Sequence, residues 1–451
     1  MNAIEMRDGS AFLRYASELH YADIAELIEG LAKETDRHFV IKILPADVLS
    51  DVVPELPDRL IEEALTSLST SRQRELLNET TDDDRVDILQ DVSAATREKL
   101  LQLLNQEDER LTRHLLSYSE DTAGGRMTTQ IGVVPVTFTV REAIDKLRKR
   151  QEETETLSRI FVVDPEKRPV GKMRLRDLTF SSLDTPVRDL MQPVEHSILA
   201  TADQETAANM LRKYDLVILP VIDEFGHLRG AITYDDAMEI LSEESTEDLE
   251  KMSGISGEQS EDSYLMTAIR THFKRRFGWL AVLGVLAIAS GYVMMRFESV
   301  LTSAFLLSLF LPMVVASGGN TGGQAATMVI RAMSLGELEP GNALKVALKE
   351  LKLGALMGLV LGGLTILFCI LLLPLFANLP SGISFPAFGF AVGLSIAVQI
   401  ATSTLIGALL PLGARAIQLD PAVVASPAIT TLVDVSGMVI YFTVAKVCLN
   451  L

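Results

Sequence analysis

Five long apolar segments in the C-terminal part of the chain constrain its fold more than any other feature. They cover about residues 277–296, 300–330, 353–373, 387–411 and 422–448. Each is long enough for a helix to cross a bilayer core of about 30 Å. We therefore predict an integral membrane protein in the lipid bilayer, with residues 271–451 forming an α-helical bundle of five transmembrane spans.

Charge is divided unequally along the chain. Residues 1–262 hold 54 acidic and 30 basic side chains, whereas residues 263–451 hold 6 acidic and 11 basic ones. The acidic part would repel the phosphates of nucleic acid, so nucleic acid is not an expected partner. Cations could be attracted to it. The two cysteines lie in apolar segments, so no disulfide framework is indicated.

The basic residues predict how the spans are oriented. Lys274, Arg275 and Arg276 precede the first span, and most other basic residues of the membrane part lie in loops expected on the same side. Such loops stay in the cytoplasm, and the first 25 residues show no signal-peptide pattern. We expect a multi-pass protein of the cell (inner) membrane, with the acidic half in the cytoplasm and the C-terminus outside. Residues 336–352 look amphipathic and are expected to form an interfacial helix.

Residues 1–125 show the apolar spacing of helices throughout. Ile24, Leu27, Ile28 and Leu31 illustrate the three- to four-residue intervals that mark one face of a helix. Short breaks containing proline or serine divide the region into loosely repeated helices, which is typical of a small α-solenoid. We predict an all-α superhelical N domain over residues 1–125.

A unit of roughly 60 residues then occurs twice. The first copy contains RIFVVDPEKRPVGKMRLRDL and the second contains VILPVIDEFGHLRGAITYDDAMEIL. Each copy alternates strand-like and helix-like segments around a polar turn. These segments resemble a tandem pair of CBS domains, which implies an α/β fold over residues 126–190 and 191–244.

The resemblance to CBS domains also implies a nucleotide site. In members that bind adenine nucleotides, residues matching Thr233 and Asp236 face the phosphate and the ribose. The second copy has the family's ending from Gly230 to Asp236, whereas the first copy has Leu175 where a serine or threonine is expected. ATP is therefore a candidate ligand of the second copy. The alternative is a CBS pair that only dimerises and transmits motion.

Residues 245–270 connect the second copy to the membrane part. The segment AMEILSEESTEDLEKM (237–252) is expected to be helical, and a polar break containing glycine and serine follows it.

Asp434 is the one charged residue expected at mid-depth in the membrane. It lies near the middle of the fifth span, and the other charged residues of the spans lie near their ends. A carboxylate at that depth costs at least about 2.5–3.5 kcal/mol, so it must be protonated, hydrated or bound to a cation. A protonated aspartate bonded to another helix is the structural alternative. In a symmetric dimer two such carboxylates would meet at the axis and would favour a divalent cation.

Two segments could supply neutral oxygens near this carboxylate. In the fifth span, Ser426 and Thr430 precede Asp434 by eight and four residues, so the three lie roughly along one helix face. In the second span, the glycines of SGGNTGG permit close backbone approach, and ordinary helix packing is the alternative there. Oxygens of this kind suit magnesium, which gives up its water reluctantly, and calcium or a transition metal is the alternative on this ground. The candidate pore-lining residues are Gly318, Gly319 and Asn320.

The whole chain resembles the MgtE family of magnesium channels. The most specific segments are SGGNTGGQAATMVIRAMSLGEL (317–338) and TTLVDVSGMVIYF (430–442), and STEDLEKM (245–252) supports them. The resemblance implies a homodimer with a pore at its axis, in which the aspartate matching Asp434 selects hydrated Mg²⁺.

The same resemblance implies regulation by cytoplasmic magnesium. Ions bound between the N domain, the CBS pair and the connecting helix would screen like charges and hold a closed state. The matching positions are Asp87, Asp91, Asp203, Glu205, Asp215, Asp236, Glu239, Glu244, Glu247 and Asp248. Several are three or four residues apart, where like charges mildly destabilise a helix and a bound cation would relieve the repulsion. A solvated acidic surface is the alternative for each residue, and Arg176 and Arg212 are candidate internal counterions.

Signals of catalysis are absent from the sequence. The six histidines form no metal-binding spacing, and GGNTGG lacks the Gly-Lys-Ser/Thr of a phosphate-binding loop. We therefore predict a homodimeric magnesium channel, not an enzyme, that cytoplasmic magnesium closes. One alternative is a CBS-regulated transporter of another divalent cation or solute, coupled to protons through Asp434. A second alternative is a membrane-anchored sensor of adenine nucleotides.

Overall fold

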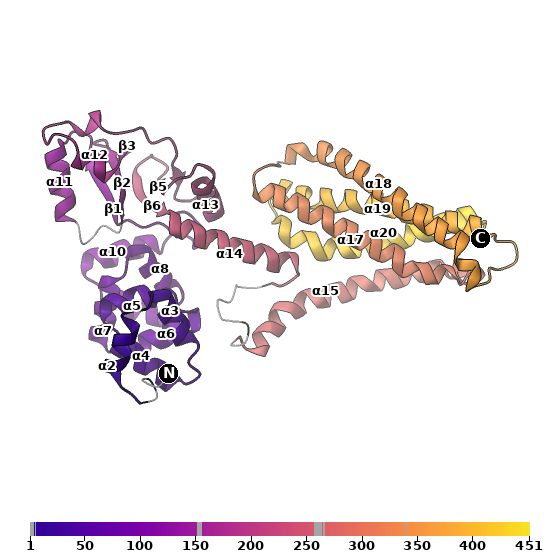
Figure 1. Ribbon diagram of the computed structural model, residues 1–451, viewed down its shortest axis with the longest axis horizontal. Helices are drawn as coiled ribbons and strands as arrows, with labels where there is room; N and C mark the ends of the chain where they lie inside the picture. The colour runs from indigo at the N-terminus through magenta and orange to yellow at the C-terminus, as the bar shows by residue number, and fades with distance from the viewer. Residues whose placement is uncertain (1–3, 5, 151–155, 257–263, 265–266, 339) are drawn as a thin grey trace. The chain divides into compact units, whose positions relative to one another are not determined.

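The computed structural model describes the chain except residues 1–3, 5, 151–155, 257–263, 265–266 and 339 and the side chains of residues 340 and 423–428. The described residues belong to two compact units (Figure 1). The first unit is Met1–Glu244 with Ser260–Thr267, and the second is Ser245–Gln259 with Ala268–Leu451.

The first unit begins with a domain made of short helices. Its core contains Ile28, Leu49, Leu65 and Leu76, none of which retains measurable exposure, so the periodic apolar positions pack against one another. The all-α character predicted for this region is confirmed, while the superhelical arrangement stays a prediction. Its described helices are α2 (Gly9–Ala16), α3 (Tyr21–Glu29), α4 (Glu34–Ile43), α5 (Ala46–Val52), α6 (Asp58–Ser67), α7 (Thr70–Glu79), α8 (Asp82–Gln90), α9 (Ala94–Leu101) and α10 (Gln106–Leu115).

The duplicated unit folds twice in the same way. In each copy the middle strand pairs parallel with the first strand and antiparallel with the third. The two three-stranded sheets have the orders β1-β2-β3 and β4-β5-β6. The first copy contains β1 (Ile131–Pro135), α11 (Val140–Lys149), β2 (Thr156–Val163), β3 (Pro169–Met173), α12 (Leu175–Thr179) and the 3₁₀ turn η2 (Val187–Asp189). The second contains β4 (Ile198–Leu199), α13 (Gln204–Lys213), β5 (Ile218–Ile222), β6 (Leu228–Thr233) and the start of α14 (Tyr234–Met252).

The second unit is a bundle of long helices. Figure 1 shows α17, α18, α19 and α20 side by side, with α15 along one side of them. The amphipathic segment 336–352 does not form a separate interfacial helix, because α18 runs without a break from Ala343 into the third span. The helices are α15 (Ile269–Arg296), α16 (Glu298–Ser303), α17 (Leu307–Ser334), α18 (Ala343–Leu371), α19 (Phe385–Ala416) and α20 (Pro421–Leu449), with 3₁₀ turns η3 (Pro340–Asn342) and η4 (Leu373–Leu375).

Four helices of the described residues are long and apolar enough to cross a membrane. They are Ile269–Arg296, Ala343–Leu375, Phe385–Ala416 and Ile429–Leu449. The second expected span falls mainly on α17, which has 28 residues but is not one of the four. The small and polar residues of SGGNTGGQ lower its mean hydropathy. The number of five spans, with the second on α17, therefore stays a prediction.

Glycines let α18 and α19 approach closely. A Cβ atom added at Gly362 would lie 2.5 Å from the carbonyl oxygen of Gly393, a separation that real Cβ atoms do not take up. A Cβ atom added at Gly358 would likewise lie too close to the backbone of Ala397, whereas a Cβ atom added at Gly363 would meet nothing within 4 Å. Small residues at such contacts are typical of packing between membrane helices, because lipid supplies no hydrophobic driving force for association.

We predict that Gly362→Val destabilises the membrane unit by about 1–3 kcal/mol, because the added side chain forces α18 away from α19. Thermal unfolding of the purified full chain in detergent measures this change. Gly363→Val is the matched control, since the same residue is added one position along toward open space, and it should unfold like the wild type. Equal unfolding of the two variants would contradict the close packing of these helices.

Candidate functional site

Three helices of the second unit meet at the residue that precedes Asp434. A Cβ atom added at Gly318 of α17 would lie 2.9 Å from a methyl group of Val433 on α20, and one at Gly322 would lie 3.3 Å from the other methyl group. Val433 is completely buried, whereas Asp434 is only partly covered. The packing thus turns the valine into the bundle and leaves the carboxylate at the edge of it.

Polar residues of α17 lie on a face that the single chain leaves open. Asn320 and Gln324 are exposed, and a Cβ atom added at Gly319 or Gly323 would meet nothing within 4 Å. Gly318 and Gly322 both pack against Val433, and Asn320, about 200° around the helix from each glycine, lies on the side of α17 away from that contact. Two of the three candidate pore-lining residues, Gly319 and Asn320, therefore lie on the open face.

Gly318, the third pore-lining candidate, does not lie on that face. It is buried between the helices, because a position two residues from Asn320 points to another side of a helix. On α20, Thr430 is exposed one helical turn before Asp434, as expected from their spacing. Ser426 falls within residues 423–428, whose side chains lie outside the described residues.

Arg126 stands at the centre of an acidic cluster in the first unit. It lies in the turn between α10 and β1, and its Nη2 donates to Glu243 Oε2 of α14 at 2.6 Å. Its Nε donates to Gln204 Oε1 at 3.0 Å, and Nη1 pairs with Asp87 Oδ2 of α8 at 3.6 Å. The guanidinium thus joins the helical domain to the second CBS copy.

The acids around Arg126 have raised pKa values. Burial raises the pKa of Asp87 to about 8 and that of Asp91 to about 7, although the Arg126 charge opposes both shifts. Burial also raises the pKa of Glu239 to about 6 and that of Asp236. More carboxyl groups gather here than one guanidinium can compensate.

Sequence reasoning missed Arg126, because its position in the TAGGRM turn gives no sign of its neighbours. The two arginines expected as counterions have other partners. Arg212 donates to Asn209 at 2.6 Å, and Arg176 pairs with Asp177 at 3.6 Å. Both lie near the acids in sequence, but their helices direct them to local partners.

Other expected regulatory acids take part in local hydrogen bonds. Asp203 is the N-cap of α13 and accepts from the backbone N–H groups of Glu205 and Thr206. The Glu205 carboxylate in turn accepts from Asn209 Nδ2 at 3.3 Å, and Glu244 accepts from Gln204 Nε2 at 2.7 Å. Asp215 takes a left-handed backbone conformation, with φ of 50°, at the turn after α13.

The candidate nucleotide residues lie together at the end of β6. Asp236 accepts hydrogen bonds from the Thr233 hydroxyl at 2.5 Å and from its backbone N–H at 3.1 Å. Gly230 lies against the carbonyl oxygen of Thr128, which excludes a side chain at that position. The pair Thr233 and Asp236 therefore caps the start of α14 in this structure.

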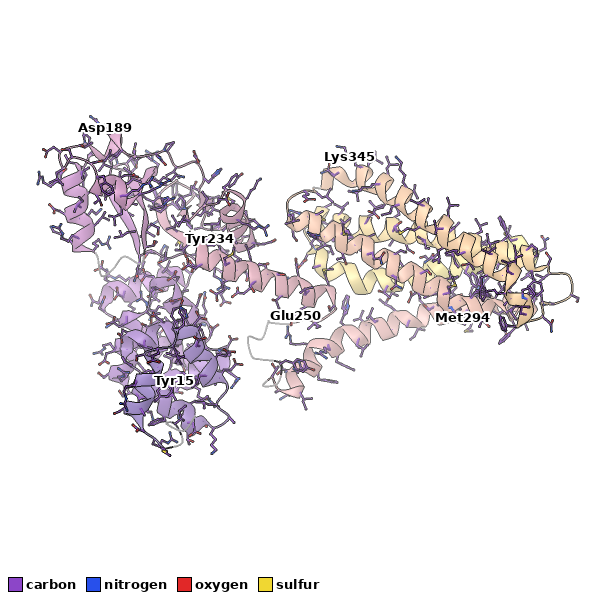
Figure 2. The ribbon with its side chains drawn as sticks, viewed as in Figure 1. Tyr15, Asp189, Tyr234, Glu250, Met294 and Lys345 are labelled. Atoms are coloured by element: carbon purple, nitrogen blue, oxygen red, sulfur yellow. The ribbon has the colours of Figure 1, made fainter. Side chains whose placement is uncertain are left out.

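The end of α14 belongs to the second unit and is held there by ion pairs. Lys251 Nζ lies 2.7 Å from Glu247 Oε1 and 2.8 Å from Asp420 Oδ2 at the start of α20. Glu250, labelled in Figure 2, pairs with Arg275 near the start of α15. Asp248 accepts a hydrogen bond from Ser334, the last residue of α17. These contacts connect the end of α14 to three helices of the membrane unit.

No preformed metal cage is present within the part of the chain that the structure describes. No group of three or more His, Cys, Asp or Glu side chains there is arranged to hold a metal ion. Instead, the two acidic sets surround basic side chains of the protein itself, Arg126 in the first unit and Lys251 in the second.

Comparison with known proteins divides the chain into the same kinds of domain. Residues 19–121 match the MgtE intracellular N domain, residues 123–183 and 187–243 match the CBS domain, and residues 311–444 match the MgtE family described as divalent cation transporter. A crystal structure of the cytosolic domain of the Mg²⁺ channel MgtE in complex with ATP is 33% identical, with a TM-score of 0.51 over 53% of this chain and 97% of that chain.

Two relatives match almost the full length of the chain. The magnesium transporter MgtE of Thermus thermophilus is 33% identical over 456 residues, which cover 99% of this chain and 97% of the relative. The magnesium transporter MgtE of Bacillus subtilis is 28% identical over 98% of this chain and 95% of its own length. The protein therefore belongs to the MgtE family of magnesium transporters, which are not enzymes.

Proposed function

We propose that the protein is a homodimeric, magnesium-selective channel in which Asp434 binds the ion during its passage through the membrane. The observation that carries this proposal is the set of polar side chains that helices of the membrane unit leave exposed. Asn320, Gln324 and Thr430 are exposed on helices of that unit, and Asp434 is partly exposed with them. Polar groups and a carboxylate at membrane depth are tolerated against protein or water, not against lipid.

A second copy of the chain is the simplest way to shield these polar residues from lipid. Related by a two-fold axis, two copies would bring the same residues from both sides around one aqueous path. The two Asp434 carboxylates would then share a divalent cation and avoid mutual repulsion. The open space beside Gly319 and Gly323 leaves room for a partner helix or for water.

Magnesium fits the proposed path better than a cation that sheds its water easily. Mg²⁺ keeps several waters and is usually bound through one or two carboxylates. Amide and hydroxyl groups of Asn320 and Thr430 can accept or donate hydrogen bonds to such waters. The names of the full-length relatives, both magnesium transporters, support the same cation.

The proposal includes five spans and a fixed orientation in the cell (inner) membrane. A buried face and an open polar face on α17 are what a span needs when it lines a path between protein copies. Basic residues at Lys274–Arg276, Arg331, Lys345 and Arg415 favour a cytoplasmic location for that side of the bundle. The acidic half would lie in the cytoplasm, and the C-terminus outside.

We further propose that cytoplasmic magnesium closes the channel by binding to the two acidic sets. The acids around Arg126 join the helical domain to α14, and those around Lys251 join the end of the same helix to the membrane unit. Bound magnesium would screen the excess negative charge at both ends of α14. The relative crystallised with ATP supports ATP as a further ligand of the CBS pair, near Gly230, Thr233 and Asp236.

We predict that Asp434→Asn abolishes magnesium flux while the protein still inserts and dimerises, because the amide cannot supply the charge that an ion at that depth requires. Magnesium uptake by liposomes that contain the purified protein measures this. Glu298→Gln is the control: it removes the same charge at the start of α16, where the side chain is exposed, and it should still conduct. Wild-type flux through the Asp434 variant would contradict the proposed ion site. Flux that requires a pH gradient would instead indicate a proton-coupled transporter.

A second prediction concerns Arg126. We expect Arg126→Leu to make α8 exchange its amide hydrogens roughly tenfold faster in the absence of divalent cations, since a charged hydrogen bond contributes about 1.5 kcal/mol. Saturating magnesium should return exchange to the wild-type rate by supplying the missing positive charge. Arg212→Leu, which removes a guanidinium bonded to Asn209, should change neither rate. Identical exchange in Arg126→Leu and wild type without magnesium would contradict the role of this cluster.

A third prediction follows from the raised pKa values of Asp87, Asp91 and Glu239. A carboxyl group with a higher pKa in the folded state stabilises that state at low pH, and this stability is lost as the pH rises through the folded-state pKa. Between about pH 5 and pH 8, α8 should therefore exchange faster as the pH rises, after correction for intrinsic exchange. Magnesium should protect α8 more at pH 8 than at pH 6. Protection independent of pH would contradict the prediction.

A further inference from the structure

Gln399 is a fully buried polar side chain near the middle of α19. It retains no measurable exposure, and its Nε2 donates to the carbonyl oxygen of Val433 on α20 at 2.9 Å. Within the part of the chain that the structure describes, its Oε1 has no hydrogen-bond partner. Among the described residues, the amide nitrogen of Gln399 is therefore hydrogen-bonded to Val433, the residue that precedes Asp434, and the amide oxygen is not hydrogen-bonded.

Two glycines on neighbouring helices form the slot for this amide. A Cβ atom added at Gly437 of α20 would lie 2.7 Å from Nε2 of Gln399, and one at Gly318 of α17 would overlap the same nitrogen. Both glycines come from the SGGNTGG and DVSGM segments that also carry the open polar face and Asp434. Three helices thus meet on a single side-chain amide.

Stability alone does not account for a glutamine at this position. An amide–carbonyl hydrogen bond contributes about 0.5–1.5 kcal/mol, whereas a buried polar atom without a partner costs about 1–3 kcal/mol. A leucine or methionine of similar volume would fill the slot without that cost. An unsatisfied buried polar group in a native structure requires an explanation, and the one contact it makes points to the ion site.

The hydrogen bond acts on the helical turn that carries Asp434. Successive residues of a helix are separated by about 100° around its axis, so fixing the buried Val433 fixes the direction of Asp434. Ser436 Oγ donates to the same carbonyl oxygen at 3.1 Å, so this oxygen accepts one hydrogen bond from within α20 and one from α19. Rotation or sliding of this turn would move the carboxylate relative to the open face.

We propose that Gln399 is a positioning residue for cation selection: its hydrogen bond to Val433 fixes the turn of α20 that presents Asp434, so the site favours a cation that requires fixed geometry over one that tolerates irregular coordination. The inference rests on the proposed role of Asp434 as the ion site. Mg²⁺ requires near-ideal geometry, whereas Ca²⁺ accepts flexible and irregular coordination. A turn that is free to move should therefore lose preference for Mg²⁺ over Ca²⁺.

The test compares Gln399→Leu and Gln399→Met with Ser403→Ala in the reconstituted full chain. Ser403 lies one helical turn along α19, is also fully buried, and its Oγ has no partner among the residues that the structure describes. Removing it controls for the loss of a buried polar atom that makes no bond to α20. Initial Mg²⁺ uptake into liposomes, alone and in competition with Ca²⁺, gives the half-saturating Mg²⁺ concentration and the half-inhibiting Ca²⁺ concentration.

We expect both Gln399 variants to unfold at the wild-type temperature or higher and to reduce the preference for Mg²⁺ over Ca²⁺ about tenfold, equivalent to about 1.4 kcal/mol. Ser403→Ala should keep the wild-type preference. An unchanged preference in both Gln399 variants, or an equal change in Ser403→Ala, would overturn the proposal. So would failure of both variants to fold, since Gln399 would then be a packing residue. A wild-type protein without divalent-cation flux would instead refute the proposed function on which the inference rests.

Discussion

A carboxylate at membrane depth must be compensated by a proton, by water or by a cation, and Asp434 lies twelve residues from Lys446, the basic residue of its own helix. The packing of the membrane unit follows from this constraint. Val433 is turned inward against α17 and α19, so the adjacent carboxylate comes to the edge of the bundle. A buried position would have left the charge without solvent, whereas an edge position would let it meet the aqueous path that we propose between two copies.

The same imbalance of charge is repeated outside the membrane spans. Arg126 contacts acids of α8 and α14, and Lys251 contacts acids of α14 and α20. In each set one basic residue serves several carboxylates, so the chain alone leaves negative charge uncompensated. If cytoplasmic magnesium regulates the protein as we propose, bound cations would supply the missing positive charge and stabilise both sets. That effect would be lost if each acid had its own lysine or arginine.

The sequence predicted the features that depend on local pattern. The all-α region, the duplicated α/β copies and the isolation of Asp434 all follow from periodicity, repetition or hydropathy. The contacts of Arg126 and Gln399 could not be predicted, because they join segments far apart in the chain. Arg176 and Arg212 were the wrong counterions for the same reason, since proximity in sequence does not determine which way a side chain points. The spacing within SGGNTGG could have shown that Gly318 and Asn320 lie on different faces of the helix, because residues two positions apart point to different sides of a helix.

The second expected span shows how hydropathy alone would underestimate a helix that lines a path for water. On α17, Gly318 and Gly322 pack against α19 and α20, while Asn320 and Gln324 lie on the open face. One face needs residues small enough for backbones to touch, and the other needs groups that bind water, so neither can carry the large apolar side chains that raise hydropathy. A helix with these two faces cannot be stable when lipid surrounds it. Its low hydropathy is therefore itself an argument that protein and water cover α17 in the membrane.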